Sequence, residues 1–162
     1  GNVLNPTITP TPVLIAHCVN NIGVFGAGVA LHLGKKYPAA KSAYLTECGA
    51  YVLGDAQFVQ LSPFLWIAHI YGQDGVGPDK NGRAPVRYWA LSKAFERVAA
   101  WQKFTGGIVT VPRIACGLAG GVYRNVIRAI HNSFDLEDND LSVYTLPNEV
   151  NDYENPTIEE LL

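Results

Sequence analysis

The sequence predicts an α/β fold, in which helices cover both faces of a mixed, mostly parallel sheet. Apolar runs typical of buried strands alternate along the chain with stretches of helical periodicity, and this alternation favours a parallel sheet between helices. Within residues 56–70, two apolar runs are separated only by Ser62 and Pro63, which indicates an antiparallel pair and makes the sheet mixed. Because 48% of the 162 residues are hydrophobic, we expect one domain with its own core.

The first half of the chain predicts a loop, a strand and two helices ahead of that antiparallel pair. Residues 1–12 are rich in proline and threonine, which is typical of a loop. The apolar run VLIAHCV at 13–19 predicts a strand covered on both faces. Helical stretches follow at 28–37, which a proline ends, and at 39–48, which a glycine ends.

The second half predicts a long loop at 71–84 with four glycines, then a helix with Pro85 in its first turn. A strand at 107–111, a further helix and a last strand at 141–146 complete the domain, which we expect to span residues 1–147. The acidic tail, 148–162, has a capping-box pattern ahead of a short helix. The apolar faces of the two helices consist of Leu91, Ala94, Phe95, Val98 and Trp101 in the first, and of Val126, Ile127, Ile130 and Phe134 in the second.

Charge and cysteine content exclude several classes of protein. A net charge of −2 makes nucleic-acid binding through a basic surface unlikely on physical grounds, because neutralising phosphates needs clustered Lys and Arg. Cys18, Cys48 and Cys116 form no CxxC pair, which suits a reducing compartment and predicts neither a disulfide framework nor a metal site. No signal peptide and no bilayer-spanning run is evident, so we expect a cytoplasmic protein without a membrane partner.

Two glycine-rich loops are the strongest indication of function. NNIGVFGAGV at 20–29 and PRIACGLAGGVY at 112–123 each follow a predicted strand and lead into a predicted helix. Glycine in such a loop lets unpaired backbone N–H groups come close enough to surround a phosphate. Because the two loops follow what would be neighbouring strands, we expect them to form two halves of one site for an extended ligand with phosphates.

Four segments in this order and spacing resemble the macro domain family, in particular its branch of ADP-ribose 1″-phosphate processing proteins and terminal ADP-ribose glycohydrolases. The segments are IAHCVNNIGVFGAGVALHLGKKYP, WIAHIYGQDGV, PVRYWAL and VPRIACGLAGG. The resemblance implies a three-layer α/β/α sandwich, and as ligand and partner it implies ADP-ribose or an ADP-ribosylated molecule. It calls for no cofactor.

The resemblance also implies which residues bind. Asn2 stands where the family has an adenine-binding Asp, and its amide oxygen can still accept a hydrogen bond. Asn20 matches the asparagine at the distal ribose, Phe25 would pack beside that ribose, and Tyr123 would form a wall of the pocket. The full ligand-binding set is Asn2, Val3, Asn21, Gly23, Val24, Phe25, Gly26, Ala27, Gly28, Val29, Gln73, Arg113, Ile114, Ala115, Cys116, Gly117, Leu118, Ala119, Gly120, Gly121 and Tyr123.

The catalytic lysine and aspartate of the glycohydrolase relatives are missing, since Gln73 and Ala119 occupy those regions. The activity we expect from the resemblance is hydrolysis at the distal ribose, with ADP-ribose 1″-phosphate as the substrate. This reaction would need a group that orients a water, and donors for the phosphoryl charge. Asn20 would help to supply the donors. His17 is the first candidate for the base and Asp74 the second.

Several residues have a plainer interpretation that the sequence leaves open. His17 could be an interior residue of its strand, Asp74 could belong to a turn, and Arg113 could brace the second loop instead of binding phosphate. Cys18 and Cys116 flank the loops, but no base is spaced to activate either as a nucleophile. The whole domain could also bind ADP-ribose without hydrolysing it. A Rossmann-type dinucleotide enzyme is less favoured, because neither loop has the GxGxxG spacing.

Overall fold

The computed structural model describes residues 3–6, 10–134 and 141–144. In this part of the chain, five strands form one sheet in the order β2-β3-β1-β4-β5. β1 pairs in parallel with both β3 and β4, β4 pairs in parallel with β5, and β2 is antiparallel to β3. The sheet is therefore mixed and mostly parallel, as predicted. The strands are β1 (Val13–Asn20), β2 (Ala56–Ser62), β3 (Leu65–Gln73), β4 (Ile108–Pro112) and β5 (Leu141–Tyr144).

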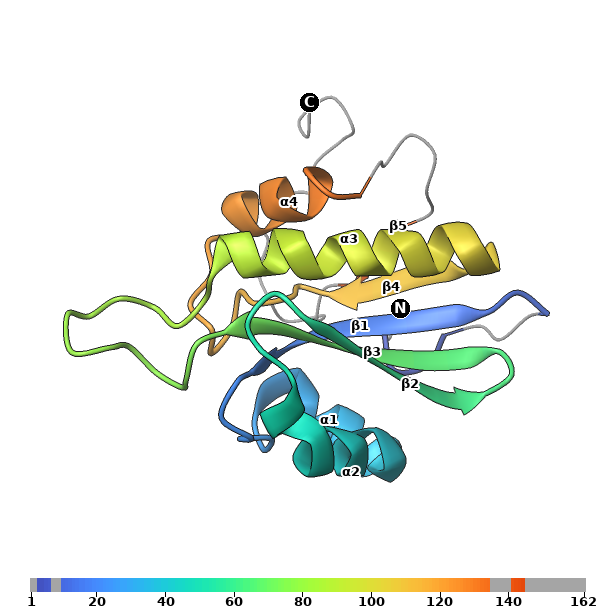
Figure 1. Cartoon of the computed structure of the whole chain (residues 1–162), viewed down its shortest axis with the longest axis horizontal. Helices are drawn as coiled ribbons and strands as arrows, with labels where there is room; N and C mark the ends of the chain where they lie inside the picture. The colour runs from blue at the N-terminus through green and yellow to red at the C-terminus, as the bar shows by residue number, and fades with distance from the viewer. Residues whose placement is uncertain (1–2, 7–9, 135–140, 145–162) are drawn as a thin grey trace.

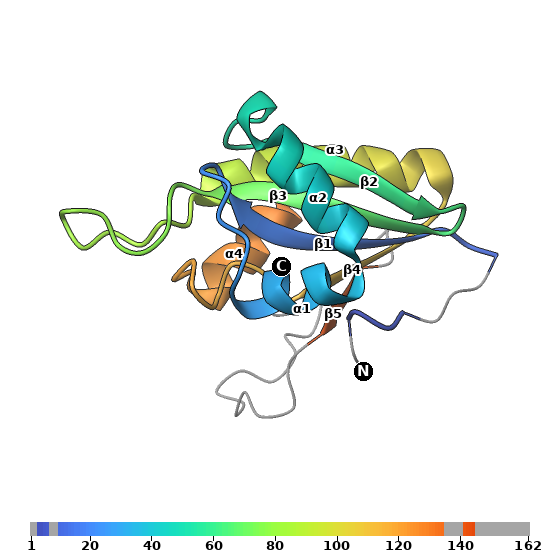
Figure 2. The same ribbon diagram turned by 90° about the horizontal axis from the view of Figure 1, so that it is seen from below.

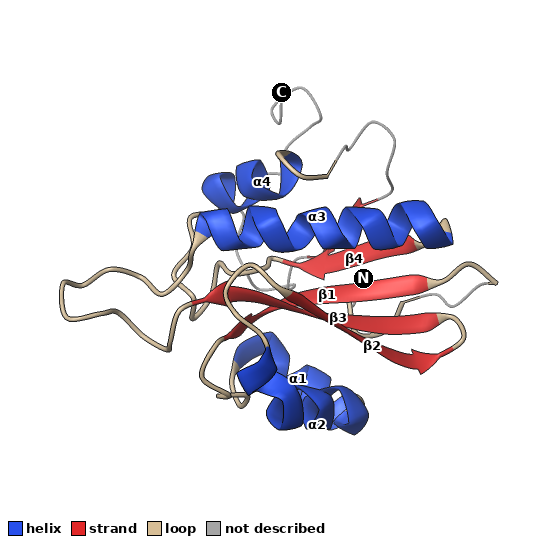
Figure 3. Cartoon of the chain, in the orientation of Figure 1, coloured by secondary structure: helices blue, strands red, loops and turns tan. Residues whose placement is uncertain are grey.

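Helices cover both faces of the sheet, which gives three layers (Figures 1 and 3). One layer contains α1 (Gly28–Lys36) and α2 (Pro38–Glu47), which continues into a short 3₁₀ turn, η1 (Cys48–Ala50). The opposite layer contains α3 (Tyr88–Thr105) and α4 (Tyr123–His131). The sequence thus predicted the α/β/α sandwich, and the structure confirms it.

The central strand β1 shows why both faces are covered. Side chains of a strand point alternately to its two faces. Leu14 and Ala16 join the core beneath α3 and α4, whereas Ile15 and Val19 join the core beneath α1 and α2. All four are at most 3% exposed, so the strand is apolar on both sides, as a central parallel strand should be.

Two predicted boundaries were wrong. α3 begins at Tyr88, not at Pro85, because Val86 still pairs with Gln73 in an isolated antiparallel bridge. β3 runs to Gln73, so the long loop begins at Asp74 and extends away from the body of the fold (Figure 1). The remaining elements agree with the predicted ones to within about three residues at their ends. The acidic tail and its predicted helix lie outside the described residues, as does Asn2.

Close packing of α3 against the sheet explains why residue 72 is a glycine. A Cβ atom on Gly72 would collide with the side chain of Leu91 and lie 3.1 Å from the Sγ of Cys18. Glycine at this position lets α3 lie directly on β3, next to the residues where the long loop starts. Among the described residues, no helix is both long and apolar enough to cross a membrane.

Candidate functional site

The two glycine-rich loops lie at the same edge of the sheet. β1 and β4 are adjacent and parallel, so their carboxyl ends point the same way. The first loop, residues 21–27, leaves β1 for α1, and the second loop, residues 113–122, leaves β4 for α4. Figure 2 shows both loops at the end of the sheet where α1 and α4 begin. Such an edge is the usual ligand site of open α/β sheets.

Both loops contain backbone N–H groups that make no hydrogen bond within the described structure, and we call these the unused amides. The N–H groups of Gly26 and Ala27 in the first loop, and of Gly117, Leu118 and Ala119 in the second, donate no hydrogen bond to any described residue. A Cβ atom built on Gly26 or on Gly117 would meet nothing within 4 Å. Gly26, Ala27, Gly117 and Leu118 are exposed, so an anion can approach the two loops at these residues, whereas Ala119 is 5% exposed.

The second loop is held in a tight turn. The N–H of Gly121 donates to the carbonyl of Ala115 at 2.8 Å, and the N–H of Gly120 donates to the carbonyl of Gly117 at 2.8 Å. Ala115 adopts a left-handed conformation with φ of 58°, which is uncommon for a residue other than glycine. Strained backbone of this kind concentrates at ligand sites, where the surrounding structure holds it in place.

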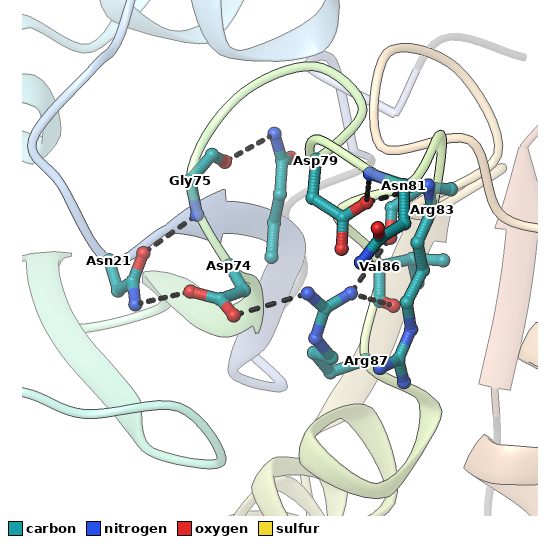
Figure 4. A network of polar contacts seen from close by, with 10 residues as sticks. Asn21, Asp74, Gly75, Asp79, Asn81, Arg83, Val86 and Arg87 are labelled. Atoms are coloured by element: carbon teal, nitrogen blue, oxygen red, sulfur yellow. Dashed lines mark hydrogen bonds and ion pairs between the residues drawn. The ribbon is translucent and has the colours of Figure 1, made fainter.

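A polar network joins the first loop to the base of the long loop (Figure 4). The Nδ2 of Asn21 donates to Asp74 at 3.1 Å, and the N–H of Gly75 donates to the Oδ1 of Asn21 at 2.9 Å. The other carboxylate oxygen of Asp74 pairs with the Nη2 of Arg87 at 3.1 Å. Gln73 donates from its Nε2 to the carbonyl of Gly75 at 3.0 Å, so its side chain also braces this loop.

Comparison with solved structures gives the family. A macrodomain protein from Streptomyces coelicolor is 32% identical to this chain, with 89% of this chain and 94% of that one covered at a TM-score of 0.75. This chain belongs to the macrodomain family. A Bacteroides thetaiotaomicron protein of unknown function is also 32% identical, with 86% and 91% covered at a TM-score of 0.81.

A more distant macrodomain neighbour was solved with a ligand. Thermosipho africanus DarTG in complex with ADP-ribose is 14% identical, covering 94% of this chain and 41% of that one at a TM-score of 0.68. At that identity the likeness shows the fold alone. No family model and no curated protein sequence matches the chain.

Asn20 has a structural role in this macrodomain. Its Oδ1 accepts hydrogen bonds from the N–H groups of Ile22 and Val24, both at 3.1 Å, and from the Tyr44 hydroxyl at 2.9 Å. Its Nδ2 donates to the carbonyl of Val24 at 2.6 Å. The side chain is 5% exposed and shapes the start of the first loop from inside. Its geometry therefore does not support the prediction that Asn20 supplies a catalytic donor at the ribose.

His17 lies in the macrodomain core, which argues against its predicted role as a base. It is 1% exposed, and its Nε2 lies 2.6 Å from the Nδ1 of His69. The Nε2 of His69 lies 2.9 Å from the carbonyl of Ala40, so that nitrogen must carry the proton and donate. In neutral His69 the Nδ1 then accepts, and His17 donates from its Nε2. Burial lowers the pKa of His17 well below 6.5, and a base must reach its substrate.

Phe25 and Val3 also belong to the core of the macrodomain. The Phe25 ring is 7% exposed and packs edge-to-face against His17 and His69, with ring centroids 5.7 and 5.8 Å apart. Val3 is 8% exposed and joins the same cluster. Both side chains are largely covered by neighbouring core residues, and the place of Phe25 beside a ribose stays a prediction.

Arg113 and Tyr123 contact each other at the two ends of the second loop. The guanidinium of Arg113 lies over the Tyr123 ring, 4.7 Å from its centroid. This cation–π contact ties the end of β4 to the start of α4 and supports the bracing role for Arg113. The remaining predicted loop residues, Gly23, Val24, Gly28, Val29, Ile114 and Cys116, lie in or next to the two loops, where the family resemblance put them.

The Cys18 thiol is not a nucleophile of this site. Burial raises its pKa to about 12, so it stays protonated. All three cysteines are free.

The sequence did not predict a surface hollow of about 240 Å³ beside the second loop. Trp89, in the first turn of α3, is 56% exposed there. The sequence held one signal for this hollow, because Trp89 lies outside the apolar face that predicted the helix. The lining residues are Arg83, Ala84, Val86, Arg87, Tyr88, Trp89 and Gly120.

Proposed function

We propose that this macrodomain binds ADP-ribose, free or attached to another molecule, with the diphosphate held between the amides of its two glycine loops. The observation that carries the proposal is the set of five unused amides at Gly26, Ala27, Gly117, Leu118 and Ala119. Two phosphates of one ligand need two clusters of donors within reach of each other. Adjacent parallel strands supply that arrangement.

Helix α1 adds to the attraction for an anion at the first loop. It begins at Gly28, directly after the unused amides, and has no acidic residue in its first turn. The positive end of its dipole therefore faces the open space without a competing carboxylate. Binding through amides and a helix end also suits a chain with a net charge of −2.

Hydrolysis at the distal ribose, with ADP-ribose 1″-phosphate as substrate, is a second proposal. The observation that favours it is the position of Asp74, whose side chain is 46% exposed and contacts Asn21 of the first loop. A carboxylate at this place can orient a water for attack on a terminal phosphate. Hydrolysis of an ADP-ribosyl bond through a lysine has less support, because Gln73 and Ala119 replace the residues that the glycohydrolase branch uses.

Titration calorimetry with ADP-ribose, ADP-ribose 1″-phosphate, NAD and AMP tests both proposals. Binding of ADP-ribose more tightly than AMP supports the two-loop site, since AMP has one phosphate. Equal affinity for AMP and ADP-ribose would contradict it, and tighter binding of NAD would favour a dinucleotide enzyme. Release of inorganic phosphate from the 1″-phosphate, lost in Asp74→Asn, would support the phosphatase. Binding without release identifies a module that recognises ADP-ribose.

A further inference from the structure

A continuous series of polar contacts runs from the first glycine loop to the second. We call its side-chain part, Asn21, Asp74 and Arg87, the loop bridge (Figure 4). Asn21 at the start of the first loop donates to one carboxylate oxygen of Asp74 at 3.1 Å. The other oxygen of Asp74 pairs with Arg87, at the N-cap of α3, also at 3.1 Å.

Arg87 connects this series of polar contacts to the second loop. Its Nη1 donates to the carbonyls of Ala84 at 2.7 Å and Val86 at 3.1 Å. The N–H of Val86 then donates to the carbonyl of Ala119 at 3.1 Å, inside the second loop. Ala119 is one of the residues with an unused amide. The bridge therefore connects the two sets of amides through the base of the long loop.

We propose that the loop bridge adjusts the separation of the two amide clusters, beyond what the backbone hydrogen bonds between the same segments fix, and so tunes affinity for a ligand with two linked phosphates. In this role Asp74 is a positioning residue, because each of its oxygens contacts the protein, while the acceptor sites that these contacts leave could still orient a water. The inference rests on the proposed ADP-ribose binding and names the residues that tune it. The spacing between phosphates in a diphosphate is fixed, so the loops must hold a matching distance.

Small displacements matter at such a site. An N–H···O hydrogen bond has a donor–acceptor distance of about 2.7–3.2 Å, so a shift of about 1 Å in one loop removes its contacts to a ligand that the other loop still holds. A ligand with one phosphate can follow a single loop as it moves. The bridge should therefore affect a diphosphate ligand more strongly than a monophosphate ligand.

The fold does not depend on the bridge. Backbone hydrogen bonds join Asn21 to Gln73 at 3.1 Å, Asp74 to Pro85 at 2.9 Å and Gly72 to Arg87 at 2.8 Å. These bonds remain when a side chain of the bridge is removed. The side chain of Asp74 is 46% exposed and that of Arg87 is 12% exposed. Without Asp74, Arg87 keeps its hydrogen bonds to the carbonyls of Ala84 and Val86, so we expect the loss of the ion pair to cost little stability. Removing it should alter ligand affinity while the melting temperature stays nearly constant.

Calorimetry on Asp74→Ala, Asn21→Ala and the double variant tests the inference, with ADP-ribose and AMP as probes. We expect each single variant to weaken ADP-ribose binding by about three- to tenfold and AMP binding by less than about twofold. The double variant should lose no more ADP-ribose affinity than the single variant with the larger loss, because both substitutions break the same connection. Asp74→Asn keeps an acceptor for Asn21 but loses the ion pair with Arg87. Its ADP-ribose affinity should therefore lie between that of the wild type and that of Asp74→Ala.

Asp79→Ala is a matched control in the same loop. The Asp79 carboxylate accepts from the N–H groups of Asn81 and Arg83 within the loop, at 2.8 and 2.9 Å. Within the described residues it makes no hydrogen bond or ion pair with Asn21, Asp74 or Arg87, and it acts on Arg87 only through its charge. Its removal should leave both affinities unchanged. Full ADP-ribose affinity in Asp74→Ala, strictly additive losses in the double variant, or equal losses for AMP would each overturn the inference. A wild-type protein that does not bind ADP-ribose would instead overturn the proposed function, and the bridge with it.

Discussion

The Nε2 of His17 and the Nδ1 of His69 lie 2.6 Å apart inside the core, on two paired strands. Both residues are at most 1% exposed. Burial lowers the pKa of His69 to about 4 and holds the pKa of His17 well below 6.5. The pair is therefore neutral at pH 7, and its hydrogen bond links β1 to β3 beneath the α1–α2 layer.

This pair predicts a loss of stability in mild acid. In the unfolded chain each histidine takes up a proton near pH 6.5, whereas in the folded chain it does so at lower pH. Between those values the unfolded state binds more protons, so the free energy of unfolding falls as the pH falls from about 7 toward 4. The slope reaches about 1.4 kcal/mol per pH unit for each histidine. Urea unfolding at a series of pH values measures it.

Two variants isolate the contribution of the pair. His69→Gln keeps an acceptor for His17 and a donor for Ala40, and it removes one titrating group, so the slope should decrease. His32→Gln, at an exposed position of α1, should leave it unchanged. An unchanged slope in His69→Gln would show that other groups cause the acid sensitivity.

Asn20 should matter for stability more than its predicted catalytic role suggests. Asn20→Ala leaves the N–H groups of Ile22 and Val24 without their shared acceptor and removes one bond from Tyr44. We expect a loss of about 1–3 kcal/mol in the free energy of unfolding. Asn21→Ala removes one exposed contact, to Asp74, and one part-buried contact, from the N–H of Gly75, and should cost less than about 1 kcal/mol. Equal losses in the free energy of unfolding of the two variants would argue against a stabilising role for the Asn20 hydrogen bonds in the first loop.

These residues show which features of the structure could be predicted from the sequence and which could not. The layers and the two loops could be predicted, because apolar periodicity and glycine spacing are local properties. The partners of His17 and Asn20 could not, because His69 lies 52 residues and Tyr44 24 residues away in the chain. The loop bridge joins Asn21 to Asp74 across 53 residues, so only the folded chain brings it together. The family resemblance named Phe25 as a ligand contact, but it could not give the packing of its ring against His17 and His69 in the core.

Backbone strain at Ala115 gives a further prediction. Its φ of 58° is left-handed, which costs an L-residue roughly 1–2 kcal/mol and costs glycine nothing. After the larger entropy of an unfolded chain with glycine is subtracted, Ala115→Gly should stabilise the fold by up to about 1 kcal/mol. Ala100→Gly, at an exposed interior position of α3, should destabilise it by about 1 kcal/mol. If both substitutions changed the free energy of unfolding in the same direction, the backbone at Ala115 would not be strained.

The open space at Gly117 allows the most direct test of the amide site. A Cβ at this position meets nothing within 4 Å, so Gly117→Val should leave the melting temperature nearly unchanged. The added side chain would stand in front of the unused amides of the second loop and keep a phosphate from approaching. Losing one charge-assisted hydrogen bond costs about 1.5–3 kcal/mol, so we expect ADP-ribose affinity to fall by about ten- to a hundredfold. Gly49→Val is the control, because its Cβ also meets nothing and Gly49 lies in η1, outside both loops. Unchanged affinity in a folded Gly117→Val protein would mean that the diphosphate does not bind at the second loop.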